Sequence, residues 1–286
     1  MKILITGGSG FIGGYVYRHL KDSGFNVKNF DIIGNSKDSD FIQGSIIDFD
    51  DVKNAVFESD IIFHFAGFSN INKVKNTPLE CVRLNILGTT NILEALRLKR
   101  DGKLIFASSV YVHNNNGHLY TSSKLAAERI CENYSTLFNV TTSIIRLGTV
   151  YGEYSRHEDV ISIFVKRMCN GENIHIHGDG EQKRNFIHGN DVARACERIL
   201  ISNVFGKKLI ISSDEQTSIN QLVSMLKKMD PSLQFMSNKE LIRKDDYVGD
   251  IGNVKETYNL LKWEPSINLL QGVNRMKNYF AKSVVI

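Results

Sequence analysis

A glycine-rich segment near the start of the chain constrains the fold more than any other feature. Residues 6–14 read TGGSGFIGG and follow an apolar run at once, and a run of helical character comes directly after them. Glycine at Gly7, Gly10 and Gly13 permits a tight turn, a close approach of backbone to a pyrophosphate, and close packing of helix on strand. The free N–H groups at the start of that helix then face the anion. The segment predicts a strand, a dinucleotide-binding loop and a helix.

A carboxylate further along the chain supports this interpretation. The next predicted strand, 26–31, ends in Asp31, about 20 residues after the glycines, where a carboxylate accepts hydrogen bonds from the adenosine ribose. Its charge repels a 2′-phosphate, so the pattern favours NAD over NADP as the cofactor. The alternative is a turn aspartate beside a structural glycine loop, and the pairing of the two signals disfavours it.

Strand-like apolar runs alternate with helix-length segments over the first 170 residues. We predict strands at 2–6, 26–31, 60–65, 103–108 and 141–146, and helices at 12–22, 49–57, 78–98, 119–137 and 158–170. Such alternation is typical of a parallel sheet with helices on both faces. We therefore expect an α/β fold with a doubly wound parallel sheet of the Rossmann type.

The alternation loosens after residue 150, which predicts a second and smaller unit. We assign residues 1–150 and about 190–212 to a dinucleotide-binding Rossmann domain. Residues from about 151 to 189 and from 213 to 286 are assigned to a smaller, mainly C-terminal lobe that binds the substrate. The length of 286 residues suits a main domain with such a lobe.

Composition excludes several classes of function. A hydrophobic content of 42% with 23% charged residues is ordinary for a globular protein. The net charge of +4 is spread along the chain and forms no basic stripe, so nucleic-acid binding is not expected. No apolar run is long enough to span a membrane and the chain begins in a strand rather than a signal peptide, so no membrane association is expected.

The cysteines and histidines give no sign of a metal site. Four cysteines lie far apart without metal spacing or a CxxC pair, and we interpret them as reduced thiols of a cytoplasmic protein: Cys81, Cys131, Cys169 and Cys196. His175 and His177 alternate on a predicted strand, but no third ligand accompanies them. We therefore predict no bound metal.

A serine, a tyrosine and a lysine form the candidate catalytic set. Ser109 follows predicted strand 103–108, and Tyr120 and Lys124 lie four residues apart on one face of the next predicted helix. A free phenol has a pKa of about 10, which a neighbouring cation or an oxidised nicotinamide lowers. We predict Tyr120 as acid/base, Lys124 as the group that tunes it, and Ser109 as the donor to the substrate oxygen. Such a tyrosine–lysine pair alone also occurs by chance on surface helices.

Together with these motifs, five further segments carry a family resemblance over nearly the whole chain. They are His64–Gly67, Asn85–Asn91, Arg146–Gly152, Gly178–Asp191 and Leu261–Pro265. The chain resembles an extended short-chain dehydrogenase/reductase of the NAD-dependent epimerase/dehydratase family, whose members act on sugar nucleotides. The resemblance implies that NAD is the cofactor and that the partner is a nucleotide-sugar substrate, with a UDP-sugar favoured.

The resemblance also implies roles for individual residues. The implied cofactor contacts are Gly7, Gly10, Phe11, Ile12 and Gly13 at the pyrophosphate, Asp31 at the ribose, Asp48 at the adenine amine, and Phe65, Ala66 and Gly67 beside the nicotinamide ribose, with Tyr120 and Lys124. The implied substrate contacts are Ser109, Thr149 and Arg184. A forked, permanent cation such as Arg184 suits a diphosphate, although a surface ion pair is the alternative for it.

The sequence departs from the family pattern at three places. Relatives that remove water or carbon dioxide carry an acid just after the catalytic serine or threonine, whereas Val110 and Tyr111 follow Ser109 here. The connection from Ser109 to Tyr120 is shorter than is common in relatives, which implies a more open pocket or a different sugar. Thr149 stands where many relatives place an asparagine. Dehydratase and decarboxylase activities are therefore disfavoured, and the nucleotide stays open.

The sequence thus predicts an NAD-dependent sugar-nucleotide epimerase that inverts the 4-position of a UDP-hexose through a 4-keto intermediate. One alternative is an NAD(P)H-dependent 4-ketoreductase of a nucleotide-linked 4-keto-6-deoxy sugar. A second is a non-catalytic dinucleotide-binding regulator. The resemblance further implies a homodimer formed through helices 78–98 and 119–137, although the apolar residues of these helices could simply cover the sheet.

Overall fold

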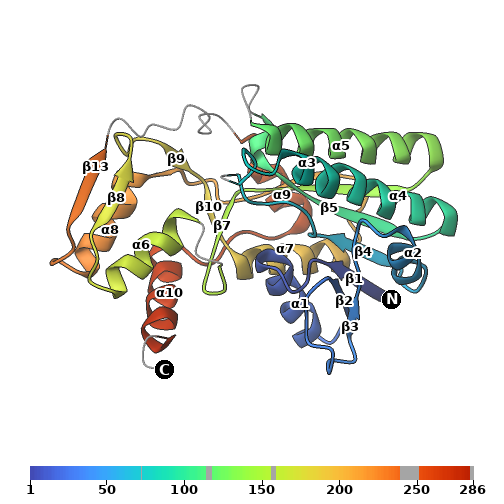
Figure 1. Ribbon diagram of the computed structural model, residues 1–286, viewed down its shortest axis with the longest axis horizontal. Helices are drawn as coiled ribbons and strands as arrows, with labels where there is room; N and C mark the ends of the chain where they lie inside the picture. The colour runs from blue at the N-terminus through green and yellow to red at the C-terminus, as the bar shows by residue number, and fades with distance from the viewer. Residues whose placement is uncertain (72, 114–117, 156–158, 239–250, 284–286) are drawn as a thin grey trace.

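The computed structural model describes residues 1–71, 73–113, 118–155, 159–238 and 251–283 (Figure 1). Its larger unit is built on one parallel sheet of seven strands in the order β11-β6-β5-β4-β1-β2-β3. These strands are β1 (Lys2–Thr6), β2 (Asn26–Asp31), β3 (Phe41–Gln43), β4 (Ile61–His64), β5 (Lys103–Ser109), β6 (Thr141–Leu147) and β11 (Lys208–Ile211). The predicted doubly wound parallel sheet is confirmed.

Helices cover both faces of this sheet because successive strand residues point to opposite sides. In β1, Ile3 and Ile5 pack under α1 (Phe11–Asp22), α7 (Gly189–Ile201) and α9 (Val254–Leu261), whereas Leu4 packs on the other side. The other face is covered by α2 (Phe49–Phe57), α4 (Gly88–Lys99) and α5 (Leu119–Phe138). Strands buried on both faces explain the continuous apolar runs in the sequence.

The order of the strands reverses beside β1, and this position defines where a ligand binds. β1 pairs with β2 on one side and with β4 on the other, so the connections that leave β1 and β4 diverge at their carboxyl ends. In open parallel sheets the ligand crevice lies at such a switch point, outside the carboxyl ends of the strands. The glycine-rich segment follows β1 at this edge, and Phe65, Ala66 and Gly67 follow β4.

A smaller unit lies at the left of Figure 1, beside the sheet. Its core is formed by α6 (Val160–Cys169), α8 (Ile219–Met229) and α10 (Leu269–Ser283) with strands of three two-stranded sheets. Those sheets pair β10 (Phe186–His188) with β7 (Thr149–Tyr151), β12 (Thr217–Ser218) with β9 (Lys183–Arg184), and β13 (Phe235–Asn238) with β8 (Ile174–His177).

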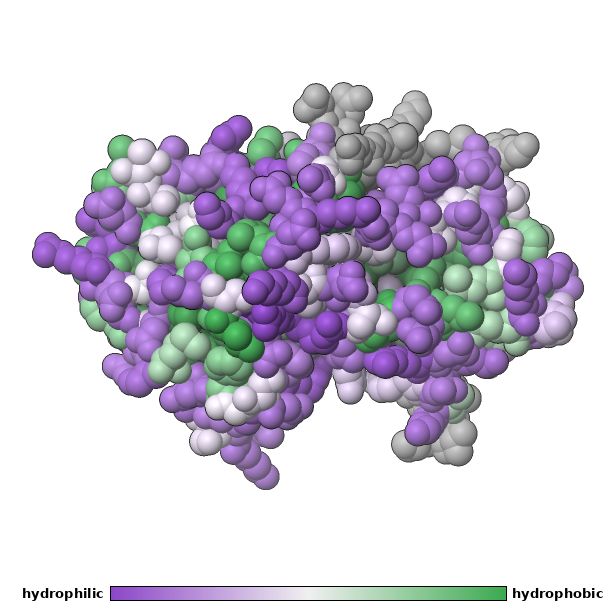
Figure 2. All heavy atoms as spheres, turned by 180° about the vertical axis from the view of Figure 1, so that it is seen from behind, coloured by the Kyte–Doolittle hydropathy of each residue, from purple (hydrophilic) through white to green (hydrophobic). Residues whose placement is uncertain are grey.

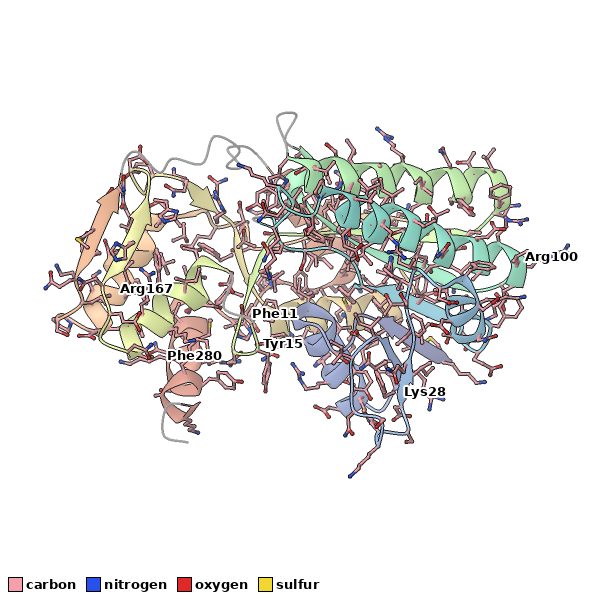
Figure 3. The ribbon with its side chains drawn as sticks, viewed as in Figure 1. Phe11, Tyr15, Lys28, Arg100, Arg167 and Phe280 are labelled. Carbon is pink, nitrogen blue, oxygen red and sulfur yellow. The ribbon has the colours of Figure 1, made fainter. Side chains whose placement is uncertain are left out.

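Tyr15 joins the two units. It lies with Phe11 on the side of α1 that faces the smaller unit (Figure 3), and its hydroxyl donates to Glu153 over 2.5 Å. The Nε2 atom of the fully buried His188 lies 3.1 Å from the same carboxylate. Although burial opposes ionisation, the contacts with His188 and Tyr15 lower the pKa of Glu153 to about 2. The helix that carries the glycine-rich segment is therefore held against the smaller unit by the hydrogen bond between Tyr15 and the Glu153 carboxylate.

The elements agree with the sequence predictions except at a few places. The predicted helix 78–98 is observed as α3 (Pro78–Val82), a π-helical turn (Arg83–Leu87) and α4. The predicted helix 158–170 is observed as α6, and residue 158 lies outside the described residues. Strands β3 and β11 were not predicted. Helix α9, from the segment predicted to join the smaller lobe, packs against β11 and α7, so the boundaries of the two domains stay a proposal.

The described residues include no helix that is both long and apolar enough to cross a membrane. On the face drawn in Figure 2, hydrophilic side chains predominate and the apolar ones gather in separate patches.

Candidate active site

The glycine-rich segment leaves its backbone open to a ligand. Gly7 has a φ of +76°, and a Cβ there would lie 2.6 Å from the backbone nitrogen of Ala66. A Cβ on Gly13 would collide with the carbonyl oxygen of Gly7. Gly10 begins α1, and no side chain of the described residues caps this end. The loop and the uncapped helix start fit a pyrophosphate, which needs free N–H groups and a close backbone.

Two aspartates were predicted to contact the adenosine half of the cofactor. Asp31 ends β2, and its carboxylate accepts the N–H of Ser9 over 3.1 Å, so it lies against the glycine-rich loop. This position fits the ribose contact. Asp48 begins α2 and accepts the N–H groups of Asp50 and Asp51 over 3.0 and 3.1 Å. Asp48 therefore caps a helix, and its contact with adenine stays a prediction.

The segment after β4 forms the next part of the same edge. The N–H groups of Phe65 and Ala66 both donate to the carbonyl of Thr6 over 3.0 Å, which holds this segment beside the end of β1. Gly67 has a φ of +153°, and a Cβ there would lie 2.7 Å from the side-chain oxygen of Asn85. The three residues thus lie at the same edge as the glycine-rich loop, and their contact with the nicotinamide ribose stays a prediction.

The structure brings the predicted catalytic set together. Ser109 ends β5, and Tyr120 and Lys124 lie on α5, where Ser109 lies close enough to the phenol of Tyr120 to influence its pKa. The ammonium of Lys124 donates to the carbonyl of Ala107 over 2.9 Å. It also lies 3.9 Å from the position of a Cβ on Gly67. Lys124 therefore points to the edge where the cofactor segments meet.

Burial dominates the electrostatics of this set. It lowers the pKa of Lys124 to about 8, because a charged ammonium loses its hydration there. Burial also raises the pKa of Tyr120, and the hydrogen bond with Ser109 opposes this only in part. The sequence predicted a lowered pKa for Tyr120, but in the protein alone the pKa is raised, since desolvation outweighs the neighbouring groups. A bound oxidised nicotinamide would add a positive charge that favours the phenolate of Tyr120.

Sequence reasoning gave no role to Asn85, which the structure places at the site. Asn85 is 1% exposed, accepts the N–H of Phe68 over 2.8 Å, and donates to Ser123 over 2.9 Å. Ser123 precedes Lys124, so Asn85 links the segment after β4 to α5. It lies in the π-helical turn, a type of turn often found at functional sites. In the sequence, Asn85 was marked only by its place at the start of the segment Asn85–Asn91, which carries part of the family resemblance.

The predicted substrate residues lie at the junction with the smaller unit. Thr149 begins β7, and its N–H donates to the carbonyl of Asn185 over 2.9 Å. Arg184, directly before Asn185, is half-buried on β9, and its guanidinium donates to the carbonyl of Lys183 over 2.8 Å. The pairing of β7 with β10 therefore brings Thr149 and Arg184 into one region, and their contacts with substrate stay predictions.

Two surface cavities lie apart from the catalytic set. One, of about 840 Å³, is lined by residues of β9, α8 and α10, among them Lys183, Asn220 and Leu270. The other, of about 540 Å³, lies between α1 and α10 and is lined by residues that include Arg18, Tyr154 and Arg275. Neither cavity contains Ser109, Tyr120 or Lys124, so we do not assign them to the candidate active site.

The sheet is doubly wound and has a glycine-rich dinucleotide loop at its switch point. Ser109 lies at the end of β5, and Tyr120 and Lys124 lie beside it on α5. These features together define a class of dinucleotide-dependent enzymes. Within that class the chain belongs to the NAD dependent epimerase/dehydratase family, whose model matches residues 3–211. The family's use of NAD agrees with the cofactor that the sequence predicts.

Relatives of the chain are named for several reactions. It is 29% identical to a putative UDP-glucose 4-epimerase of Methanocaldococcus jannaschii, with 97% of each chain covered. It is 26% identical to the human dTDP-D-glucose 4,6-dehydratase, over 99% of this chain and 90% of that protein. Among solved structures, the UDP-glucuronic acid 4-epimerase of Bacillus cereus with UDP-glucuronic acid and NAD is 26% identical, with a TM-score of 0.87 over 99% of this chain and 100% of that one.

Replacement of Asp31 by asparagine tests the predicted preference for NAD. Asparagine retains an oxygen for the N–H of Ser9 but removes the charge that repels a 2′-phosphate. The affinity for NADP relative to NAD is expected to rise about tenfold, or about 1.4 kcal/mol, in fluorescence titrations with both cofactors. Asp22→Asn, at the exposed far end of α1, is the control and should leave the ratio unchanged. An unchanged ratio in Asp31→Asn would remove Asp31 from the ribose site.

Proposed function

We propose that this chain is an NAD-dependent nucleotide-sugar epimerase, and that it inverts the 4-position of a UDP-hexose through a transient 4-keto sugar. The observation that carries the proposal is the convergence on one edge: α5 brings Tyr120 to Ser109 and turns Lys124 toward Gly67. The relatives named as UDP-sugar 4-epimerases support both the substrate class and the reaction.

The proposed chemistry divides between cofactor and protein. NAD⁺, when bound, accepts a hydride from the sugar and returns it. Tyr120 takes the proton of the 4-hydroxyl on its phenolic oxygen and gives it back, while Ser109 donates to the oxygen that becomes a carbonyl. Lys124 stabilises the phenolate by its charge.

Epimerisation needs no further acid, and this agrees with the position that follows Ser109. There Val110 is buried against Ile251 and Val254. The same position carries the acid in relatives that remove water or carbon dioxide, so we favour epimerisation over those reactions.

We also propose the binding residues that the resemblance implies. The glycine-rich segment at Gly7, Gly10, Phe11, Ile12 and Gly13 would hold the pyrophosphate of NAD at the uncapped start of α1. Arg184 and Thr149 would contact the diphosphate of the sugar nucleotide from the smaller unit. The mutual placement of β7, β9 and β10 supports this, because it brings both side chains to the same junction.

A panel of nucleotide sugars tests the proposed function. The purified protein, without added cofactor, is incubated with UDP-, GDP-, dTDP- and CDP-hexoses, and the sugar C4 proton is followed by NMR. Inversion with a UDP-hexose is the expected result. If no hexose is converted but NAD(P)H is oxidised with 4-keto-6-deoxy sugars, the protein is a reductase. Cofactor binding without any turnover would identify a regulator.

We propose that the protein forms a homodimer through α3, α4 and α5. These helices and the π-helical turn carry exposed apolar side chains, namely Leu79, Leu87, Leu98, Leu125, Leu137 and Phe138. We expect a dimer in analytical ultracentrifugation and a monomer for the double variant Leu87→Glu/Leu125→Glu. Leu260→Glu, on α9, changes an equally exposed leucine and should leave the dimer intact. A monomeric wild type would refute the proposal.

We further propose a cytoplasmic location. All four cysteines are free, and Cys81, Cys131 and Cys196 are buried. Unpaired thiols are typical of a reducing compartment.

A further inference from the structure

A buried ion pair lies directly behind the proposed catalytic set. Glu128 of α5 is 1% exposed, and its two carboxylate oxygens accept from the Nε and Nη2 atoms of Arg146 over 2.9 and 2.6 Å. Arg146 belongs to β6, and only 17% of its side chain is exposed. This is a bidentate pair, the geometry in which an arginine holds a carboxylate most firmly.

The pair also reaches the strand that carries Ser109. The hydroxyl of Ser108 donates to Glu128 over 2.6 Å, and Ser108 is the register partner of Arg146 between β5 and β6. A third nitrogen of Arg146, Nη1, donates to the Nε2 atom of His113 over 3.0 Å. His113 ends the 3₁₀ turn Val110–His113, which begins directly after Ser109. Contacts of the pair therefore hold the chain on both sides of Ser109.

The same carboxylate holds the helix that carries the other two groups. Glu128 follows Lys124 by four residues and Tyr120 by eight, so the three side chains lie on one face of α5. The salt bridge of Glu128 with Arg146 joins this face of α5 to β6. The distance between the end of β5 and this face of α5 sets the spacing between Ser109 and the phenol of Tyr120.

We propose that Glu128, together with Arg146, is a positioning residue that fixes Ser109 relative to Tyr120 and Lys124. This inference rests on the proposed function, because positioning matters only if these three groups react with a substrate. The pair touches neither substrate nor cofactor in this role. It acts through Ser108 and His113 on one side and through the helix on the other. Displacements of about 1 Å by a mutation outside the reacting groups can lower a rate about 100-fold.

A purely structural role for the pair is the competing explanation. A buried ion pair is weak evidence for stability, because replacing both partners by apolar residues of similar volume is often neutral or stabilising. A structural role and a positioning role therefore predict different results when both partners are replaced by apolar residues. The double variant Glu128→Leu/Arg146→Met should remain folded, while it removes the contacts to Ser108 and His113.

Two variants and one control test the proposal in the full-length protein. Glu128→Gln keeps the shape of the side chain and removes its charge, and the double variant removes the pair. Both should lower kcat for the UDP-hexose by about 10- to 100-fold while KM changes by less than about threefold. Glu132→Gln is the control, because Glu132 lies one turn further along α5 and pairs instead with Arg129 and Lys208. It should leave kcat unchanged.

The titration of Lys124 gives a second readout that needs no substrate. The titratable groups that interact with Lys124 are Cys81 on α3, Cys131 and Glu128 on α5, and His64 on β4, and the charge of Glu128 raises the pKa of Lys124. In Glu128→Gln the pKa of Lys124, followed by NMR of ¹³C-labelled lysine, should therefore fall. In Glu132→Gln it should not change. The alkaline limb of the rate profile should move to lower pH in the same variant.

The outcomes separate this inference from the proposed function. Folded Glu128→Gln and double variants with wild-type kcat and an unchanged Lys124 titration would overturn the positioning role. A lower kcat with wild-type thermal stability in the double variant would establish it, since a structural role predicts that activity follows stability. If the wild type converts no sugar, the proposed function fails. A lowered Lys124 pKa in Glu128→Gln would then still support the contact with the site, and an unchanged one would refute it.

Discussion

Tyr120→Phe is expected to lower kcat for epimerisation by about 10²- to 10⁴-fold, the range typical of general acid–base catalysis. The variant removes one hydroxyl, which lies close to Ser109 and carries the proton in the proposed reaction. The ring remains, so the packing of α5 should not change. Turnover is followed by NMR of the sugar C4 proton, and NAD affinity by titration.

The control for this variant lies on the same helix. Tyr134→Phe also removes a hydroxyl, which donates to Glu94 over 3.2 Å at the other end of α5, away from Ser109. It should retain the wild-type kcat and the wild-type affinity for NAD, whereas Tyr120→Phe should still bind NAD through the remaining cofactor contacts. A Tyr120→Phe protein with full activity would exclude Tyr120 as the acid/base. It would also reopen the assignment of the whole catalytic set.

The parallel sheet could be predicted because its signals are local. Five of its strands were predicted, because they contain buried apolar residues and the turns and helices between them carry the glycines and the alternation that reveal them. The strand β3 is only Phe41–Gln43 and has no fully buried residue, so it has no apolar run to detect. Its pairing with β2 depends on the neighbouring strand.

The π-helical turn shows why part of the site was not predictable. Residues 83–87 lie inside one continuous helical pattern, and nothing in the spacing of apolar residues marks a wider turn. Tertiary contacts explain it instead: Asn85 bonds both Phe68 and Ser123, which belong to other parts of the chain. The direction of the Tyr120 pKa shift was also missed, because desolvation depends on packing that the sequence does not show.

Glu128, by contrast, left a signal in the sequence. It lies four residues after Lys124, so helical spacing alone places it on the catalytic face of α5. An acid predicted on the buried face of a helix requires a partner. That reasoning would have predicted a buried ion pair, but the identity of Arg146 as its partner depends on the register of β5 and β6.

Lys124→Met should lower activity and at the same time stabilise the protein at neutral pH. Burial lowers the pKa of Lys124 from 10.5 to about 8, so the folded state disfavours the charged ammonium. The free energy of unfolding is therefore highest above pH 10.5 and is reduced as the pH falls to about 8. At about 1.4 kcal/mol per pKa unit, the reduction at pH 7 is about 3 kcal/mol. Methionine avoids this cost but loses the hydrogen bond to Ala107, worth about 1 kcal/mol.

We therefore expect Lys124→Met to raise the free energy of unfolding at pH 7 by about 2 kcal/mol. The gain should shrink between pH 8 and 10.5, because the wild-type lysine loses its proton near pH 8 in the folded state and only near pH 10.5 in the unfolded state. Urea denaturation across this range measures it, and kcat is expected to fall about 100-fold because the phenolate loses its cation. Lys166→Met, at an exposed lysine of α6, should show no such pH-dependent gain. A destabilised Lys124→Met protein at pH 7 would mean that the contacts of the ammonium outweigh its desolvation, and that the site holds this charge at no cost to the fold.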